Sequence, residues 1–181
     1  AARSNAGSNP YGVSWNSTGL KMYGVDSSII TIYNVTTPYT LEGAAYGGQE
    51  NMYVSARALC FSPDYSVMIA AAATSNGGVY KWTLATPGNL GSLTGRTLVA
   101  FAEASALPIR SAKFFDSGNK LMIRRTTAAF EYSLSTPYDI STHVYEGSSL
   151  TGLTDSYVNI YEDTINGGLI LGSIVDSDSI K

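Results

Sequence analysis

The chain has 181 residues, of which 44% are hydrophobic and 11% aromatic, so it can fill the core of one domain and is too short for a large multi-domain enzyme. Its formal net charge of −3, without a basic stripe, argues against nucleic acid as a partner. One cysteine and one histidine exclude an intrachain disulfide and a metal site built from several such ligands. No run of about 18 apolar residues occurs, so we expect no membrane contact.

The first recurring feature is an aromatic residue followed by a turn and a short apolar run. It begins at Trp15, Phe61 and Phe114, which are 46 and 53 residues apart. We call these three residues the leading aromatics. Their recurrence indicates a repeated structural unit rather than a single irregular domain.

A second feature leads from an aromatic residue through hydroxyl side chains to a proline. Its aromatic residues are Tyr33, Trp82 and Tyr132, and its prolines, at positions 38, 87 and 137, are 49 and 50 residues apart. Two independent features that keep register in three copies predict a tandem repeat of about 49 residues. We expect all six aromatic residues to pack between the repeats.

Within each copy the composition favours β-strands. β-Branched and aromatic residues gather in short runs bounded by Gly, Asn, Asp, Ser or Pro. Residues 32–35 and 79–84 alternate as half-buried strands do. The alanine-rich segment 67–73 takes the position of 20–23 in the first copy, so we predict a strand there, whereas 98–104 fits a short helix or a strand.

The period and the strand content predict an all-β fold of tandem antiparallel four-stranded blades, as in a β-propeller. A single repeat domain spans 1–181, with units 9–54, 55–107 and 108–154 and a partial unit 155–181. The chain therefore holds about three and a half blades. Because one blade cannot bury its own faces, the incomplete set is either part of something longer or completed by another chain.

His143 lies near Asp139 and Ser141, which together offer a base, an acid and a nucleophile. The other copies have no histidine at this position, and Ser and Asp are frequent in turns, so we interpret His143 as a surface or turn residue. Cys60 lies in an apolar run and is interpreted as a core residue. Without a known catalytic motif we expect no catalytic residue and no enzyme; a glycosidase pair of carboxylates stays open, since it depends on spatial separation.

Acidic residues are densest at Glu162–Asp163 and around Asp176 and Asp178, and Asp26 and Asp116 lie in predicted turns. None of these stretches has the ligand spacing of an EF-hand. Aspartates in hairpin turns commonly bond their own backbone instead. We expect no metal site and no cofactor, with a weak surface ion site as the alternative.

Tyrosine side chains that face solvent are the residues that would recognise a sugar. Tyr39 and Tyr138 follow prolines in equivalent loops, so they are the candidates for glycan-facing positions. Trp82 aligns with Tyr33 and Tyr132 and is interpreted as a packing residue.

Two segments resemble a repeat of virion structural proteins of tailed bacteriophages. Residues 130–142 read FEYSLSTPYDIST, and residues 15–23 read WNSTGLKMY. In the family an aromatic-turn-Gly-Lys-Met-Tyr strand pair precedes a Tyr-x-Leu-Ser-x-Pro-Tyr-Asp-Ile-Ser-Thr segment. The second copy departs from it, because Tyr65 stands where glycine is expected and Gly88-Asn89 replaces Tyr-Asp. The resemblance implies propeller-like blades and a capsid- or tail-associated component without catalytic residues.

We therefore expect a non-enzymatic structural component of a virus particle. It would act through self-assembly, as a homo-oligomer, or through contacts with other virion proteins. The alternative is a carbohydrate-binding module that attaches to a host-surface glycan, in the virion or as an extracellular protein.

Overall fold

The computed structural model describes residues 11–73, 78–104, 108–151, 159–163 and 168–172. The predicted all-β fold is confirmed, and every sheet is antiparallel. The first sheet contains β1 (Gly12–Trp15), β2 (Lys21–Asn34), β3 (Ala45–Phe61), β4 (Val67–Ala72), β5 (Gly78–Leu84) and β6 (Leu93–Ala100) in this order. The second contains β7 (Ser111–Phe115), β8 (Lys120–Arg124), β9 (Ala128–Leu134) and β10 (His143–Thr151), and the third β11 (Asn159–Asp163) and β12 (Gly168–Gly172).

Three single turns of 3-10 helix interrupt the strands. They are η1 (Leu90–Ser92), η2 (Asp116–Gly118) and η3 (Ile140–Thr142). The strand predicted at 67–73 is confirmed as β4. Segment 98–104 starts within β6, whose last residue is Ala100. In the part of the chain that the structure describes, no helix is long and apolar enough to cross a membrane.

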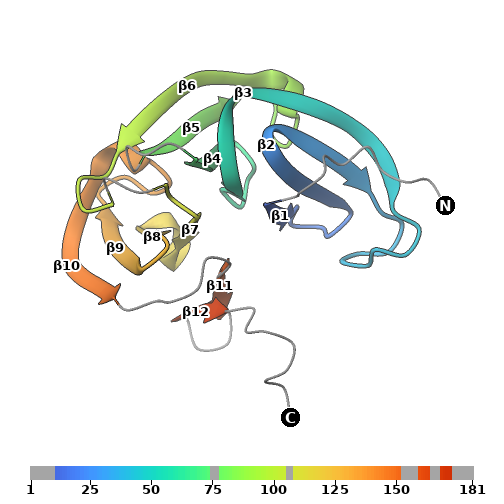
Figure 1. The fold of residues 1–181 in the computed structure, drawn as a ribbon. Coiled ribbons are helices and arrows are strands. Elements are labelled where there is room, and N and C mark those ends of the chain that lie inside the picture. Colours follow the sequence, from blue (N-terminus) through green and yellow to red (C-terminus); the bar gives the residue numbers. More distant parts are fainter. Residues whose placement is uncertain (1–10, 74–77, 105–107, 152–158, 164–167, 173–181) are drawn as a thin grey trace, which may run out of the picture.

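The sheets are arranged in an arc (Figure 1). β1 and β7 lie on its concave side, and β3, β6 and β10 form its convex rim. Along the concave side β3 packs against β1 and β7, and β11 packs against β7. The first strands of successive copies are therefore neighbours. Of the predicted partial unit, only β11 and β12 belong to the described residues, and 173–181 lie outside them.

β2 folds back on itself. The N–H of Val35, just after its end, donates to the carbonyl of Leu20, just before its start, at 2.9 Å. A straight strand of this length would separate these groups by about 46 Å. The reversal falls at Ser27, whose φ of 51° lies in the left-handed region, within the turn that the sequence predicts.

β3 belongs to two copies at once. Its first part pairs with β2 at residues 45–51, and its last part pairs with β4 at residues 56–61. The expected boundary between residues 54 and 55 therefore falls inside a strand, and the first two copies share one six-stranded sheet. We call β1, β2 and the first part of β3 unit 1, the last part of β3 with β4–β6 unit 2, and β7–β10 unit 3.

The leading aromatics occupy the same register in all three units. Each lies opposite an apolar residue of the next strand: Trp15 opposite Met22, Phe61 opposite Met68, and Phe114 opposite Leu121. Met68 and Leu121 in turn lie opposite Trp82 and Tyr132. The hydrogen bond that closes β2 recurs from Leu84 to Ser66 at 2.8 Å and from Leu134 to Asn119 at 2.7 Å, which places Tyr33 in the equivalent position.

We call the three residues at these positions the leading row of each unit. The row of unit 2 packs toward unit 1, where Met68 and Trp82 share a buried cluster with Tyr23, Val25 and Ile30. The row of unit 3 packs toward unit 2 in a second cluster, which holds Phe114, Leu121 and Tyr132 together with Ile69 and Val79. The hydrophobic core therefore lies between units, because each sheet buries its apolar face against the next one.

Candidate functional site

A tyrosine ring covers the leading aromatic of each unit. Tyr39 lies against Trp15 with ring centroids 5.8 Å apart, and Tyr138 lies against Phe114 at 5.2 Å. Both tyrosines have left-handed backbones, with φ of 57° and 61°. Tyr39 is 60% exposed, whereas Tyr138 is half-buried. The two candidates for glycan contact thus share a packing role, and only Tyr39 is widely open to solvent.

Unit 2 places the ring by a different route. Here Tyr65, from the turn after the first strand, lies 5.2 Å from Phe61. The N–H of Gly88 donates to the carbonyl of Tyr65, so Gly88 takes the position that Tyr39 and Tyr138 have in the hydrogen bonds of the other two units. Tyrosine and glycine have exchanged places between the two loops, so a ring fills the same space in every unit.

The exchange has a steric cause. A Cβ atom at Gly19 would lie 2.6 Å from the ring of Tyr39, and one at Gly118 would overlap the ring of Tyr138. A Cβ atom at Gly88, by contrast, would lie 3.9 Å from the Cβ atom of Tyr65. One loop must therefore carry glycine where the other carries the ring. The departure of unit 2 from the repeat pattern, visible in the sequence, is explained by this pairing.

The leading aromatics meet at a cavity of about 310 Å³ on the concave side of the arc. Its aromatic lining consists of Trp15, Phe61, Tyr65, Phe114, Phe115 and Tyr138. Its other side chains include the hydroxyls of Ser14, Ser62 and Ser117, the thiol of Cys60 and the ammonium of Lys113. The volume is at the lower end of the range for small-molecule sites, about 300 Å³. The cavity is the candidate functional site.

Sequence reasoning did not find this cavity, although a signal exists. Ser14, Cys60 and Lys113 each immediately precede a leading aromatic, so the same register position in three units faces one space. Side chains alternate along a strand, and this position therefore points away from the leading row. Lys113 is the single charged group of the lining and forms no ion pair with any residue that the structure describes.

The lining of the cavity offers aromatic faces, hydroxyl groups and one ammonium group. Cys60 is 3% exposed, as expected for a core residue, and its Sγ lies 3.7 Å from the carbonyl oxygen of Phe61. Burial raises the pKa of the Tyr65 hydroxyl to about 12, so it stays neutral and donates to the carbonyl of Trp15 at 2.8 Å. Aromatic faces, hydroxyls and one ammonium can hold a polar ring or an anionic group.

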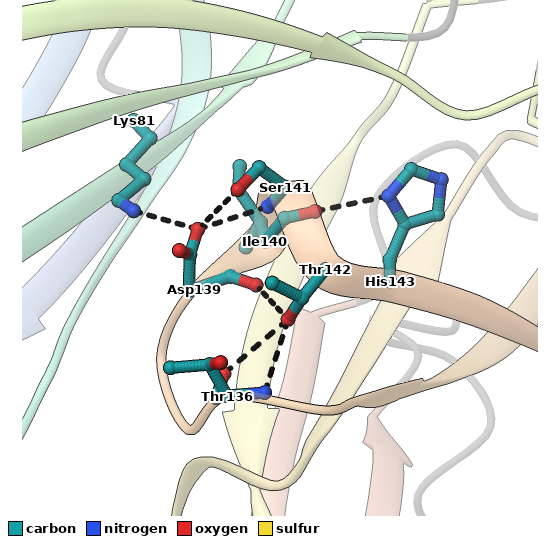
Figure 2. Close-up of polar contacts among 7 residues, drawn as sticks. All are labelled: Lys81, Thr136, Asp139, Ile140, Ser141, Thr142 and His143. Atoms are coloured by element: carbon teal, nitrogen blue, oxygen red, sulfur yellow. Dashed lines mark hydrogen bonds and ion pairs between the residues drawn. The ribbon is translucent and has the colours of Figure 1, made fainter.

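His143, Asp139 and Ser141 do not form a nucleophile and base arrangement. Figure 2 shows the imidazole turned away from the other two side chains. Its Nδ1 lies 2.9 Å from the carbonyl of Ile140, and its ring lies 4.3 Å from that of Phe101. The hydroxyl of Ser141 donates to Asp139 at 2.7 Å. The histidine is the first residue of β10, half-buried and held by backbone and aromatic contacts, so it is a packing residue at a strand start and not the surface or turn residue expected from the sequence.

Asp139 instead joins two units. Its carboxylate accepts from the backbone of Ser141, which caps η3, and pairs with Lys81 of β5 at 2.7 Å (Figure 2). The hydrogen bond from Lys81, followed by those from Ser141, lowers the pKa of Asp139 to about 2. The pair is partly exposed, with side-chain fractions of 19% for Lys81 and 30% for Asp139. It therefore ties unit 2 to unit 3 at moderate strength.

No group of three His, Cys, Asp or Glu side chains that could hold a metal ion occurs among the residues described. Asp26 lies in β2, next to the reversal at Ser27, and Asp116 lies at the start of η2. Glu162 and Asp163 belong to β11, whereas Asp176 and Asp178 lie outside the described residues.

These features define an all-β protein of antiparallel sheets packed face to face. No family model matches the chain, and no curated protein matches it. A chain of Kuenenia stuttgartiensis hydrazine synthase has a TM-score of 0.57 at 12% identity, covering 90% of this chain and 41% of that one. A chain of the mitotic checkpoint complex has a TM-score of 0.46 at 13% identity, covering 63% and 33%. The chain spans less than half of either, and at these identities the likeness concerns fold alone.

The tyrosine and glycine pairing predicts a rescue. In unit 3, Gly118→Tyr places a second ring where Tyr138 lies, and Tyr138→Gly removes the ring, so each lowers the free energy of unfolding by about 2 kcal/mol. The double variant recreates the arrangement of unit 2. Its loss of unfolding free energy should therefore be about 1 to 3 kcal/mol smaller than the sum of the two single losses. Urea unfolding of the four proteins measures this coupling.

The matched control combines Gly19→Tyr with Tyr138→Gly. These positions belong to different units, so their effects should add within about 0.5 kcal/mol. Equal rescue in the control, or none within unit 3, would show that the two loops do not share one ring site.

The ion pair predicts a pH dependence. Because the folded pKa of Asp139 is about 2 against 3.8 unfolded, its contribution is complete above pH 4 and is lost as the pH falls toward 2. Asp139→Asn keeps an oxygen for the cap, as Asn89 does at η1. It should lower stability by about 1 kcal/mol at pH 7, after discounting for exposure, and progressively less in acid.

Lys81→Met provides the second arm of this test. It should cost a similar amount in the wild type and little in the Asp139→Asn background, because the pair is already broken there. Additive effects of the two substitutions in urea unfolding at pH 7 would contradict the pairing.

Proposed function

We propose that the chain is a non-enzymatic structural component of a virus particle, built from β-propeller-like blades. It acts through contacts with copies of itself or with other virion proteins. The observation that carries this proposal is the recurrence of the leading row, which has the same register in all three units and packs units 2 and 3 each against the preceding unit. Stacked units of this kind draw much of their stability from the contacts with their neighbours.

The arrangement of strands supports the propeller-like interpretation. Each unit runs from a first strand on the concave side to a fourth strand on the convex rim (Figure 1). The first strands of successive units are neighbours. An arc of radially ordered antiparallel sheets is the geometry of propeller blades around an axis.

A structural role agrees with the chemistry of the described side chains. The His143 and Cys60 side chains are engaged in packing and backbone contacts. Charged residues make up only 14% of the chain, and interface cores are depleted in charge and enriched in tyrosine and methionine. The virion assignment itself rests on the resemblance of residues 130–142 and 15–23 to phage repeats.

The proposal predicts that peptides of this chain occur in purified virus particles. In quantitative mass spectrometry of particles banded in a density gradient, they should remain after a salt wash, at a constant ratio to the major capsid protein. A chain that serves the infected cell instead would be recovered from the soluble lysate and lost from the banded particles, which would contradict the virion role.

The cavity favours a second candidate, a carbohydrate-binding module for a host-surface glycan. Six aromatic side chains and three serine hydroxyls converge there, and Lys113 adds one positive charge. Sugars stack their apolar faces on aromatic rings and bond hydroxyl groups at their edges. Of the two predicted glycan-facing residues, Tyr138 lines the cavity and Tyr39 does not.

The two tyrosines provide a matched pair for the test. Tyr138→Ala should weaken binding of a host polysaccharide about tenfold, because it removes a stacking face. Tyr39→Ala removes a ring with the same local packing but outside the cavity, and should leave affinity unchanged. Titration calorimetry with polysaccharide from the host envelope measures both; equal losses, or no binding by the wild type, would reject this candidate.

A further inference from the structure

One apolar sheet face has no second sheet across it among the described residues. It belongs to unit 1 and contains the leading row, Trp15, Met22 and Tyr33, together with Val13 and Tyr46 at its ends. We call these five residues the open face. Val13 is 57% exposed and Tyr46 54%, while the leading row is half-buried.

Most of the equivalent positions in the other units are buried, although Phe61 and Tyr145 are half-buried like the row of unit 1. Those of unit 2 include Leu59, Met68 and Trp82, and those of unit 3 include Ala112, Leu121 and Tyr132. The first set is covered by unit 1 and the second by unit 2. In units 2 and 3, the face that carries the leading row is therefore covered by the preceding unit.

Exposed apolar side chains are concentrated in the same unit. Of the eleven large hydrophobic residues that are exposed in the described structure, eight lie between Tyr11 and Tyr53. The open face itself contains no charged residue and two tyrosines. This composition is that of an interface core rather than of an ordinary solvent-facing surface.

We propose that the open face binds a second copy of this chain, one of whose sheets lies across it as unit 1 lies across unit 2. The inference deepens the proposed assembly role and rests on it. A second copy is the occupant because sheets of this same chain already cover the equivalent rows of units 2 and 3. The faces of units 1 and 2 that do so are buried within their own chain, so the sheet that a second copy presents is at its other end, in unit 3 or in β11 and β12. The contact continues an interface that the structure shows twice.

The test is the mass of the full chain in solution. Sedimentation equilibrium over a range of concentrations should give a species of at least twice 19.2 kDa. Val13→Lys places a charge in the open face and should raise the dissociation constant at least tenfold. Leu98→Lys is the matched control, because Leu98 is 49% exposed on β6 of unit 2, away from the open face and from the sheets at the other end of the chain, and it should leave the association unchanged.

Tyr46→Lys repeats the test at the outer end of the face, in case Val13→Lys disturbs β1. A monomeric wild type at high micromolar concentration overturns the inference. So does equal weakening by Val13→Lys and Leu98→Lys, or association that neither Val13→Lys nor Tyr46→Lys affects while both variants unfold like the wild type.

The two proposals fail separately. A chain that is monomeric yet present in purified particles overturns the second-copy contact and leaves the virion role standing, with another virion protein on the open face. A chain that self-associates through this face but is missing from particles overturns the virion role alone.

Discussion

Face-to-face packing of neighbouring sheets is the interaction on which the rest of the structure depends. Each unit is a thin antiparallel sheet with apolar side chains on both faces, so it gains stability only when another sheet covers them. The two buried clusters lie between units: one where units 1 and 2 of the six-stranded sheet face each other, and one between that sheet and unit 3. The arc, the cavity between the leading aromatics and the open face of unit 1 all follow from this constraint.

The tyrosine and glycine exchange shows what the repeat preserves. Unit 2 has Tyr65 and Gly88 where unit 3 has Gly118 and Tyr138, yet a ring covers the leading aromatic in both. The preserved property is a filled volume beside that aromatic, not a residue type at one position. Cores tolerate paired changes of this kind because total volume is kept.

The sequence predicted the parts of the fold that have a period. The spacing of Trp15, Phe61 and Phe114 gave their common register, and comparison between copies identified β4 as a strand despite its alanines. It did not predict that β3 would run unbroken through the expected boundary, nor that Tyr138 would turn toward Phe114. Both depend on how the units meet in space, which no local pattern encodes.

The contacts between units also differ in a way that bears on recognition. Lys81 of unit 2 pairs with Asp139 of unit 3, whereas the hydrogen-bond register places Ile32 at the position of Lys81 and Asn89 at that of Asp139 in the preceding contact. Stacking therefore proceeds without the ion pair. A partly exposed pair adds little stability, but it penalises a neighbour that lacks the opposite charge. The apolar rows thus pack units 2 and 3 against the units before them, and the charged pair adds a polar contact that units 2 and 3 make and units 1 and 2 lack.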